Sequence, residues 1–71
     1  RLEEAAASYR RVVALEPKLA DAHLLLGDVL VRQQQWEQAV ASYRRAIALD
    51  PANPQAHHNF GSVLQAVGRR D

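Results

Sequence analysis

Three histidines are the first candidates for a chemical site in this sequence. His23 is followed 34 residues later by His57, and His58 comes directly after it. Imidazole is a common metal ligand, but adjacent residues of a helix point about 100° apart. The sequence has no cysteine, and no acidic residue completes a ligand set at a suitable spacing. We therefore expect packed histidines, with no metal and no cofactor.

A hydrolase triad is the second chemistry that the residue types permit. Asp21, His23 and Ser42 supply the three kinds of side chain. Nothing in their spacing places them in hydrogen-bonding order, and the sequence has no turn that would expose a nucleophile. The sequence thus predicts that this chain is not an enzyme.

Two arginine pairs, Arg10–Arg11 and Arg44–Arg45, could attract phosphate groups. The acidic residues interspersed with them are Glu3, Glu4, Glu16, Glu37 and Asp50. The formal net charge is only +1, which is too balanced for a general attraction to nucleic acid or to an anionic membrane. We expect these pairs to lie on a solvated outer face, with no nucleic acid as partner.

The elements that must position all these residues follow from an internal repeat. The segment "ASYRRVVALEP", Ala7 to Pro17, returns as "ASYRRAIALDP", Ala41 to Pro51. At this offset of 34 residues about 15 of 37 overlapping pairs are identical, where unrelated segments would give roughly two or three. Self-similarity at this period is typical of arrays of stacked structural units.

Apolar residues recur at helical spacing throughout the chain, and no strand pattern is present. We expect helices at about 2–16, 20–34, 36–50 and 54–67. Pro17 and Pro51 should end the helices before them, while Asn53 should cap a helix whose first residue is Pro54. The short connections predict antiparallel helix hairpins. The predicted fold class is therefore all-α.

Glycine inside a helix costs about 1 kcal/mol relative to alanine, and both Gly27 and Gly61 fall inside predicted helices. Close packing should compensate. We expect Gly27 and Ala39 to let two helices approach, with Tyr43 and Leu30 filling the space around the crossing.

The segment from residue 20 to residue 53 resembles one complete tetratricopeptide repeat. The residues that carry the resemblance are Leu26, Gly27, Leu30, Ala39, Tyr43, Ala46 and Pro51. Residues 1–19 resemble the second helix of a preceding repeat. Residues 54–71 resemble the first helix of a following one, with "GRRD" beginning the next turn. The resemblance implies an alpha-alpha superhelix of four helices.

Proteins of this family are binding scaffolds, so the resemblance implies a protein or peptide partner held in a concave groove. The groove positions are Asp21, Leu24, Leu25, Asp28, Val31, Arg32, Gln55, His58, Asn59, Ser62 and Gln65. Asn59 is similar to the asparagine that contacts peptide backbone in O-linked N-acetylglucosamine transferase-type repeats, although Leu25 holds that position one repeat earlier. An alternative function is the substrate-recognition arm of a larger, glycosyltransferase-like enzyme.

A third expectation is end-to-end self-association as a structural scaffold. Repeats of this kind bury their apolar faces only against neighbours, and the apolar residues at the two ends are Leu2, Tyr9, Val13, Phe60, Leu64 and Val67. The C-terminal helix of one copy could then pair with the N-terminal helix of the next.

The sequence also bears on membranes. No apolar run approaches the roughly 18 to 20 residues of a membrane span, and the N-terminal segment is charged. We expect a soluble chain with no membrane partner, and we favour a cytoplasmic location.

Overall fold

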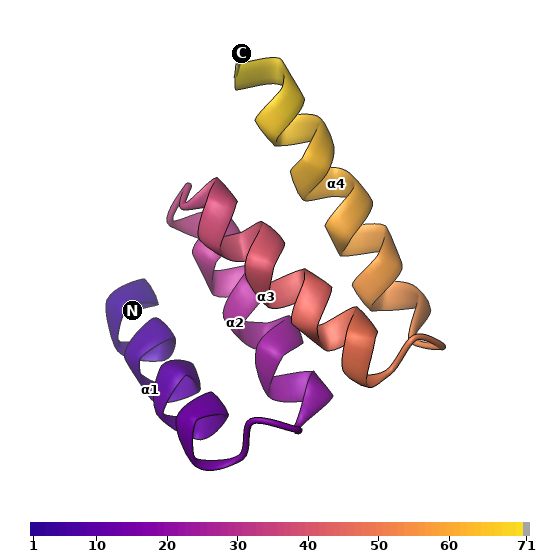
Figure 1. Ribbon diagram of the computed structural model, residues 1–71. Coiled ribbons are helices and arrows are strands. Elements are labelled where there is room, and N and C mark those ends of the chain that lie inside the picture. Colours follow the sequence, from indigo (N-terminus) through magenta and orange to yellow (C-terminus); the bar gives the residue numbers. More distant parts are fainter. Residues whose placement is uncertain (71) are drawn as a thin grey trace.

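The computed structural model describes residues 1–70, and α-helix is the only regular secondary structure over that range (Figure 1). The helices are α1 (Leu2–Leu15), α2 (Ala20–Arg32), α3 (Trp36–Leu49) and α4 (Pro54–Arg70). Their order and their N-terminal ends match the prediction from sequence, and the all-α fold is confirmed.

The C-terminal end of α4 differs from the prediction. The helix runs on through Gly68 and Arg69 to Arg70, so a turn beginning at "GRRD" is wrong for these residues, and Asp71 lies outside the described residues. No atom lies within 4 Å of the Cβ position of Gly68. Gly68 does not end the helix, and each residue after it up to Arg70 continues the helical hydrogen bonding.

The connections are fixed by the residues expected to act there. The side-chain oxygen of Asn53 accepts a hydrogen bond from the backbone N–H of Gln55 at 2.9 Å, which is the predicted cap with Pro54 at the first helical position. Glu16, immediately before Pro17, leaves the helical region with φ −133° and ψ 73°, as the proline ring requires.

Between α2 and α3 the chain reverses in a compact Schellman turn. The N–H of Gln34 donates to the carbonyl of Val31, and the N–H of Gln35 donates to the carbonyl of Leu30, each at 2.9 Å. Gln34 takes a φ of 60°, a left-handed conformation that costs a non-glycine residue about 1 to 2 kcal/mol. This turn sets α2 and α3 side by side as an antiparallel hairpin.

The helices stack in chain order, with α1 and α4 on opposite sides of the central α2–α3 pair (Figure 1). The α2–α3 pair packs most extensively, and α1 on α2 resembles α4 on α3 in extent. The core cluster is formed by Leu24, Leu26, Leu30, Ala39, Tyr43, Ala46, Ala56 and Val63.

Gly27 marks the closest approach within the α2–α3 hairpin. A Cβ atom placed on Gly27 would lie only 2.6 Å from Cε1 of Tyr43. The nearest atoms to that position all belong to the Tyr43 ring and not, as expected from sequence, to Ala39, which is buried in the same core. An aromatic ring resting directly on a helix backbone is therefore the reason for this glycine.

Gly61 holds the equivalent position one repeat later, yet no atom lies within 4 Å of its Cβ position. The close packing that was expected to compensate for a glycine inside α4 is absent among the described residues. The two glycines thus share a position in the repeat but have opposite surroundings.

This contrast predicts opposite effects of one substitution on stability. Gly27→Ala should lower the free energy of unfolding by about 1 to 3 kcal/mol, because the new methyl group overpacks a buried ring. Gly61→Ala should raise it by about 0.5 to 1 kcal/mol, because alanine is the better helix former and meets nothing. Urea unfolding of dilute protein, followed by circular dichroism, measures both. Equal effects at the two positions would contradict this explanation of Gly27.

Candidate functional site

A cleft of about 320 Å³ lies between α2 and α4, with residues of α3 completing its wall. It is lined by Asp28, Val31, Arg32, Trp36, Tyr43, Asn59, Ser62, Val63 and Ala66. The helices that flank it are the two that carry the groove positions expected from sequence, so it is the candidate functional site.

A polar cluster of three residues is the chemical centre of this cleft. Oδ1 of Asp28 accepts a hydrogen bond from the hydroxyl of Tyr43 at 2.5 Å and a second from Nδ2 of Asn59 at 3.0 Å. These residues come from α2, α3 and α4, so one carboxylate oxygen links three helices. Hydrogen bonds to an ionised acceptor are roughly twice as strong as those between neutral groups.

The surroundings of Tyr43 alter its acidity. Burial, the hydrogen bond to Asp28 and the negative charge of that carboxylate, in that order, raise the pKa of the Tyr43 phenol well above its ordinary value. The hydroxyl therefore remains a proton donor to Asp28 and is not available as a general base near neutral pH.

The orientation of the Asn59 amide follows from its partner. A carboxylate can only accept hydrogen bonds, so the NH₂ group of Asn59 must face Asp28. The side-chain carbonyl oxygen of Asn59 is then the atom that can accept a bond from another molecule. Because Asn59 is half-buried, this acceptor is held in place by the same hydrogen bond that orients the amide.

The structure divides the eleven expected groove positions into three groups. Those that line the cleft are Asp28, Val31, Arg32, Asn59 and Ser62. Those that are exposed on α2 or α4 without lining it are Asp21, Leu25, Gln55, His58 and Gln65.

Leu24 forms the third group by itself, and its placement in the groove is corrected. The side chain is only 6% exposed and belongs to the core cluster shared by α2, α3 and α4. Burying a leucine gains about 1.5 to 3 kcal/mol, which a groove position open to water would forfeit.

Trp36 and Tyr43 also line the cleft, although neither is among the groove positions expected from sequence. Tyr43 is 2% exposed and reaches the cleft edge through its hydroxyl, whereas Trp36 is half-buried at the start of α3. The sequence does hold one signal that could have identified them: a phenol and an indole each carry a polar atom that must find a partner when the ring is buried.

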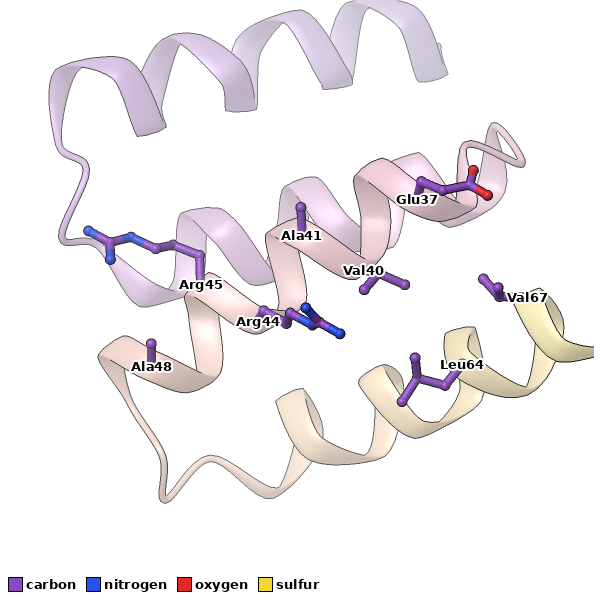
Figure 2. Close-up of a pocket in the computed structure, with 8 residues that line it drawn as sticks. All are labelled: Glu37, Val40, Ala41, Arg44, Arg45, Ala48, Leu64 and Val67. Carbon is purple, nitrogen blue, oxygen red and sulfur yellow. The ribbon is translucent and has the colours of Figure 1, made fainter.

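A second and larger cleft, of about 660 Å³, lies between α3 and α4 (Figure 2). It is lined by Glu37, Val40, Ala41, Arg44, Arg45, Ala48, Leu64 and Val67. Figure 2 shows Val40 and Arg44 reaching from α3 toward Leu64 on α4. The guanidinium carbon of Arg44 lies 6.0 Å from the ring centre of Phe60, within the range of a cation–π contact.

His23 and His57, which hold equivalent positions in the repeat, each stabilise a loop through a hydrogen bond. Nε2 of His23 donates to the carbonyl oxygen of Pro17 at 2.9 Å, and Nε2 of His57 donates to that of Pro51 at 2.7 Å. Each bond closes the loop that leads into the next helix. No cluster of three or more metal-ligating side chains is found in residues 1–70.

Ser42, the serine considered above for a hydrolase triad, is a buried residue of α3. Asp21 is exposed on α2. The arrangement supplies no exposed nucleophile at this serine.

Comparison with protein-family models decides the family. A model described as TPR repeat matches residues 1–34 and again residues 27–68. The chain belongs to the tetratricopeptide repeat family. The two overlapping matches follow the internal period and agree with a helix-hairpin solenoid. A search of curated proteins gives no significant match.

Tetratricopeptide repeats mediate protein–protein interactions and are not themselves catalytic modules. Within residues 1–70 no helix has both the length and the apolar character needed to cross a membrane. The family therefore agrees with a binding scaffold whose partner is a protein or a peptide.

The raised pKa of Tyr43 predicts how stability depends on pH. Because this pKa is higher in the folded than in the unfolded chain, its contribution is fully present below about pH 10 and declines above it, by about 1.4 kcal/mol per pH unit. Tyr43→Phe should remove this slope and leave only the part due to other groups. Urea midpoints between pH 9 and 11.5 compare the two proteins. Parallel pH profiles would contradict the assignment.

Proposed function

We propose that this chain binds an extended peptide, or a segment of a partner helix, in the cleft between α2 and α4. The observation that carries the proposal is the fixed carbonyl oxygen of Asn59, which the hydrogen bond to Asp28 holds in a set orientation. An acceptor that is already ordered loses little entropy on binding, and such preorganisation is a main source of affinity.

The chemistry of the cleft favours a ligand that offers N–H donors. Asn59 presents a carbonyl oxygen, and Asp28 is a carboxylate, so both polar groups on the floor accept hydrogen bonds. A peptide main chain supplies such donors whatever its side chains. Val31 and Ala66 add apolar wall, and Arg32 adds a positive charge that suits an acidic residue of the ligand.

The same residue supports a second candidate, the substrate-recognition arm of a larger glycosyltransferase-like enzyme. Asn59 is similar to the backbone-contacting asparagine of O-linked N-acetylglucosamine transferase-type repeats. Leu25, 41% exposed, holds the equivalent position one repeat earlier, so a run of such asparagines does not extend to that repeat. The leucine would place an apolar contact beside the main-chain contact of Asn59. A catalytic domain in the same gene would favour this candidate.

Trp36 provides a direct reporter for the proposed site. It is the single tryptophan of the chain and lines the cleft, so a ligand that enters should change its fluorescence. Peptides selected from a displayed library of random 12-residue sequences are the probes. We expect them to alter Trp36 emission, and we expect Asn59→Ala to weaken their binding about tenfold, as loss of a buried hydrogen bond would.

His58→Ala is the matched control, because His58 is the neighbour of Asn59 on α4 but does not line the cleft. It should leave the affinity of the selected peptides unchanged. Circular dichroism checks that both variants fold. Peptides that bind equally well to Asn59→Ala, or that leave Trp36 emission unaltered, would show that this cleft is not the binding site.

A further inference from the structure

The larger cleft, between α3 and α4, is an apolar surface that the peptide-binding proposal does not use. Its repeat equivalent is the surface where α3 itself packs on α2. Leu30 on α2 is 1% exposed, whereas Leu64, the same position on α4, is 43% exposed. The difference in exposure arises because α3, the second helix of the repeat, covers Leu30 on α2. No such helix covers α4 among the described residues.

The helix that would fit this surface is specified by the repeat. On α2 the surface is occupied by α3, and α1 is nearly the same sequence one period earlier, with "ASYRR" common to both. Ala5, Ser8 and Tyr9 of α1 are also less covered than their counterparts on α3. Tyr9 is half-buried, whereas Tyr43 is almost fully buried. Among the described residues, the exposed faces of α1 and α4 therefore each present one half of a contact already made between α2 and α3.

We propose that α1 of a second copy docks on α4 beside α3, in the register that α3 adopts on α2 beside α1. This proposal is independent of peptide binding, because it uses the opposite side of α4. The register follows from shifting each observed contact by one repeat, so every pair of facing residues is fixed in advance.

The first pair is Tyr9 of the second copy and Gly61. In the molecule, the Tyr43 ring rests on Gly27 so closely that no Cβ would fit. Shifted by one repeat, the Tyr9 ring rests on Gly61, whose surroundings are open in the single copy. The glycine inside α4, which costs helix stability with no compensating contact of its own, acquires the same role as Gly27.

The second pair adds charge complementarity. In the molecule, Nη2 of Arg10 on α1 donates to Oε1 of Gln38 on α3 at 2.8 Å. Shifted by one repeat, the donor is Arg44 and the acceptor is Glu4 of the second copy. A hydrogen bond from a guanidinium group to a neutral amide within the chain becomes an ion pair between copies. In the single copy Glu4 lies 3.9 Å from the N-terminal amine, and both groups of this contact are exposed.

The contact is head-to-tail, because the two surfaces differ. A bound copy still presents its own α3–α4 cleft, so a third copy can add in the same way. The expected product is an open series of oligomers whose mean size grows with concentration, continuing the superhelix of the repeats. A closed dimer is not expected.

Charge reversal gives the sharpest test. Glu4→Arg alone sets arginine against Arg44, and Arg44→Glu alone sets glutamate against Glu4, so each variant should lower the association constant by about tenfold or more. An equimolar mixture should associate again, because both of its alternating contacts then join opposite charges. Sedimentation equilibrium at concentrations up to millimolar measures all three samples against wild type. Lys18→Glu, which changes charge in the α1–α2 loop, should associate like wild type.

Gly61→Ala tests the register separately. The added methyl group has room in the single copy, so the variant should fold, yet it should weaken association by displacing the Tyr9 ring.

In the charge-reversal experiment, renewed association of the mixed variants cannot come from repaired folding, since neither chain is altered on mixing. A wild-type chain that stays monomeric at millimolar concentration, or an association that neither Gly61→Ala nor the single charge reversals weaken, would overturn the proposal. A foreign helix would then be the better occupant of this cleft.

Discussion

The contact between the Tyr43 ring and the backbone of Gly27 sets how closely α2 and α3 pack, and α1 and α4 pack on that pair. It brings α2 and α3 close enough for the core to exclude water, and the ring is held at its far end by the hydrogen bond from its hydroxyl to Asp28. A small residue on one helix and an aromatic on the other thus set both the distance and the orientation of the hairpin. The turn at Gln34 serves the same hairpin by reversing the chain within three residues.

The cleft between α2 and α4 depends on that contact through Asp28. The carboxylate that fixes Tyr43 also fixes Asn59, so one oxygen atom joins α4 to the α2–α3 hairpin in addition to the packing of α4 on α3. An acceptor group is thereby held on the floor of the cleft without a rigid loop or a metal ion. A site built on helices in this way keeps its geometry when the exposed side chains around it change.

Local signals explain how much of this could be predicted from the sequence. The helices, the Asn53 cap and the hairpin order follow from periodicity, prolines and short connections, which act over a few residues. The hydrogen bonds of Asp28 join residues 15 and 31 positions away, so no local pattern indicates them. Leu24 was misplaced because a family position assigns a helix face but not its burial. The extension of α4 to Arg70 was missed because the apolar periodicity ends at Val67, whereas the helix continues beyond it without that signal.

A double-mutant cycle between Gly27 and Tyr43 tests the central claim most directly. The free energy of unfolding is measured for wild type, Gly27→Ala, Tyr43→Val and the double variant. If the ring is the reason for the glycine, alanine at position 27 destabilises the wild type but becomes neutral or stabilising once Tyr43 is valine, since the helix then gains about 1 kcal/mol with no clash. The same destabilisation by Gly27→Ala in both backgrounds would contradict the account, because the glycine would then be required by something other than the Tyr43 ring.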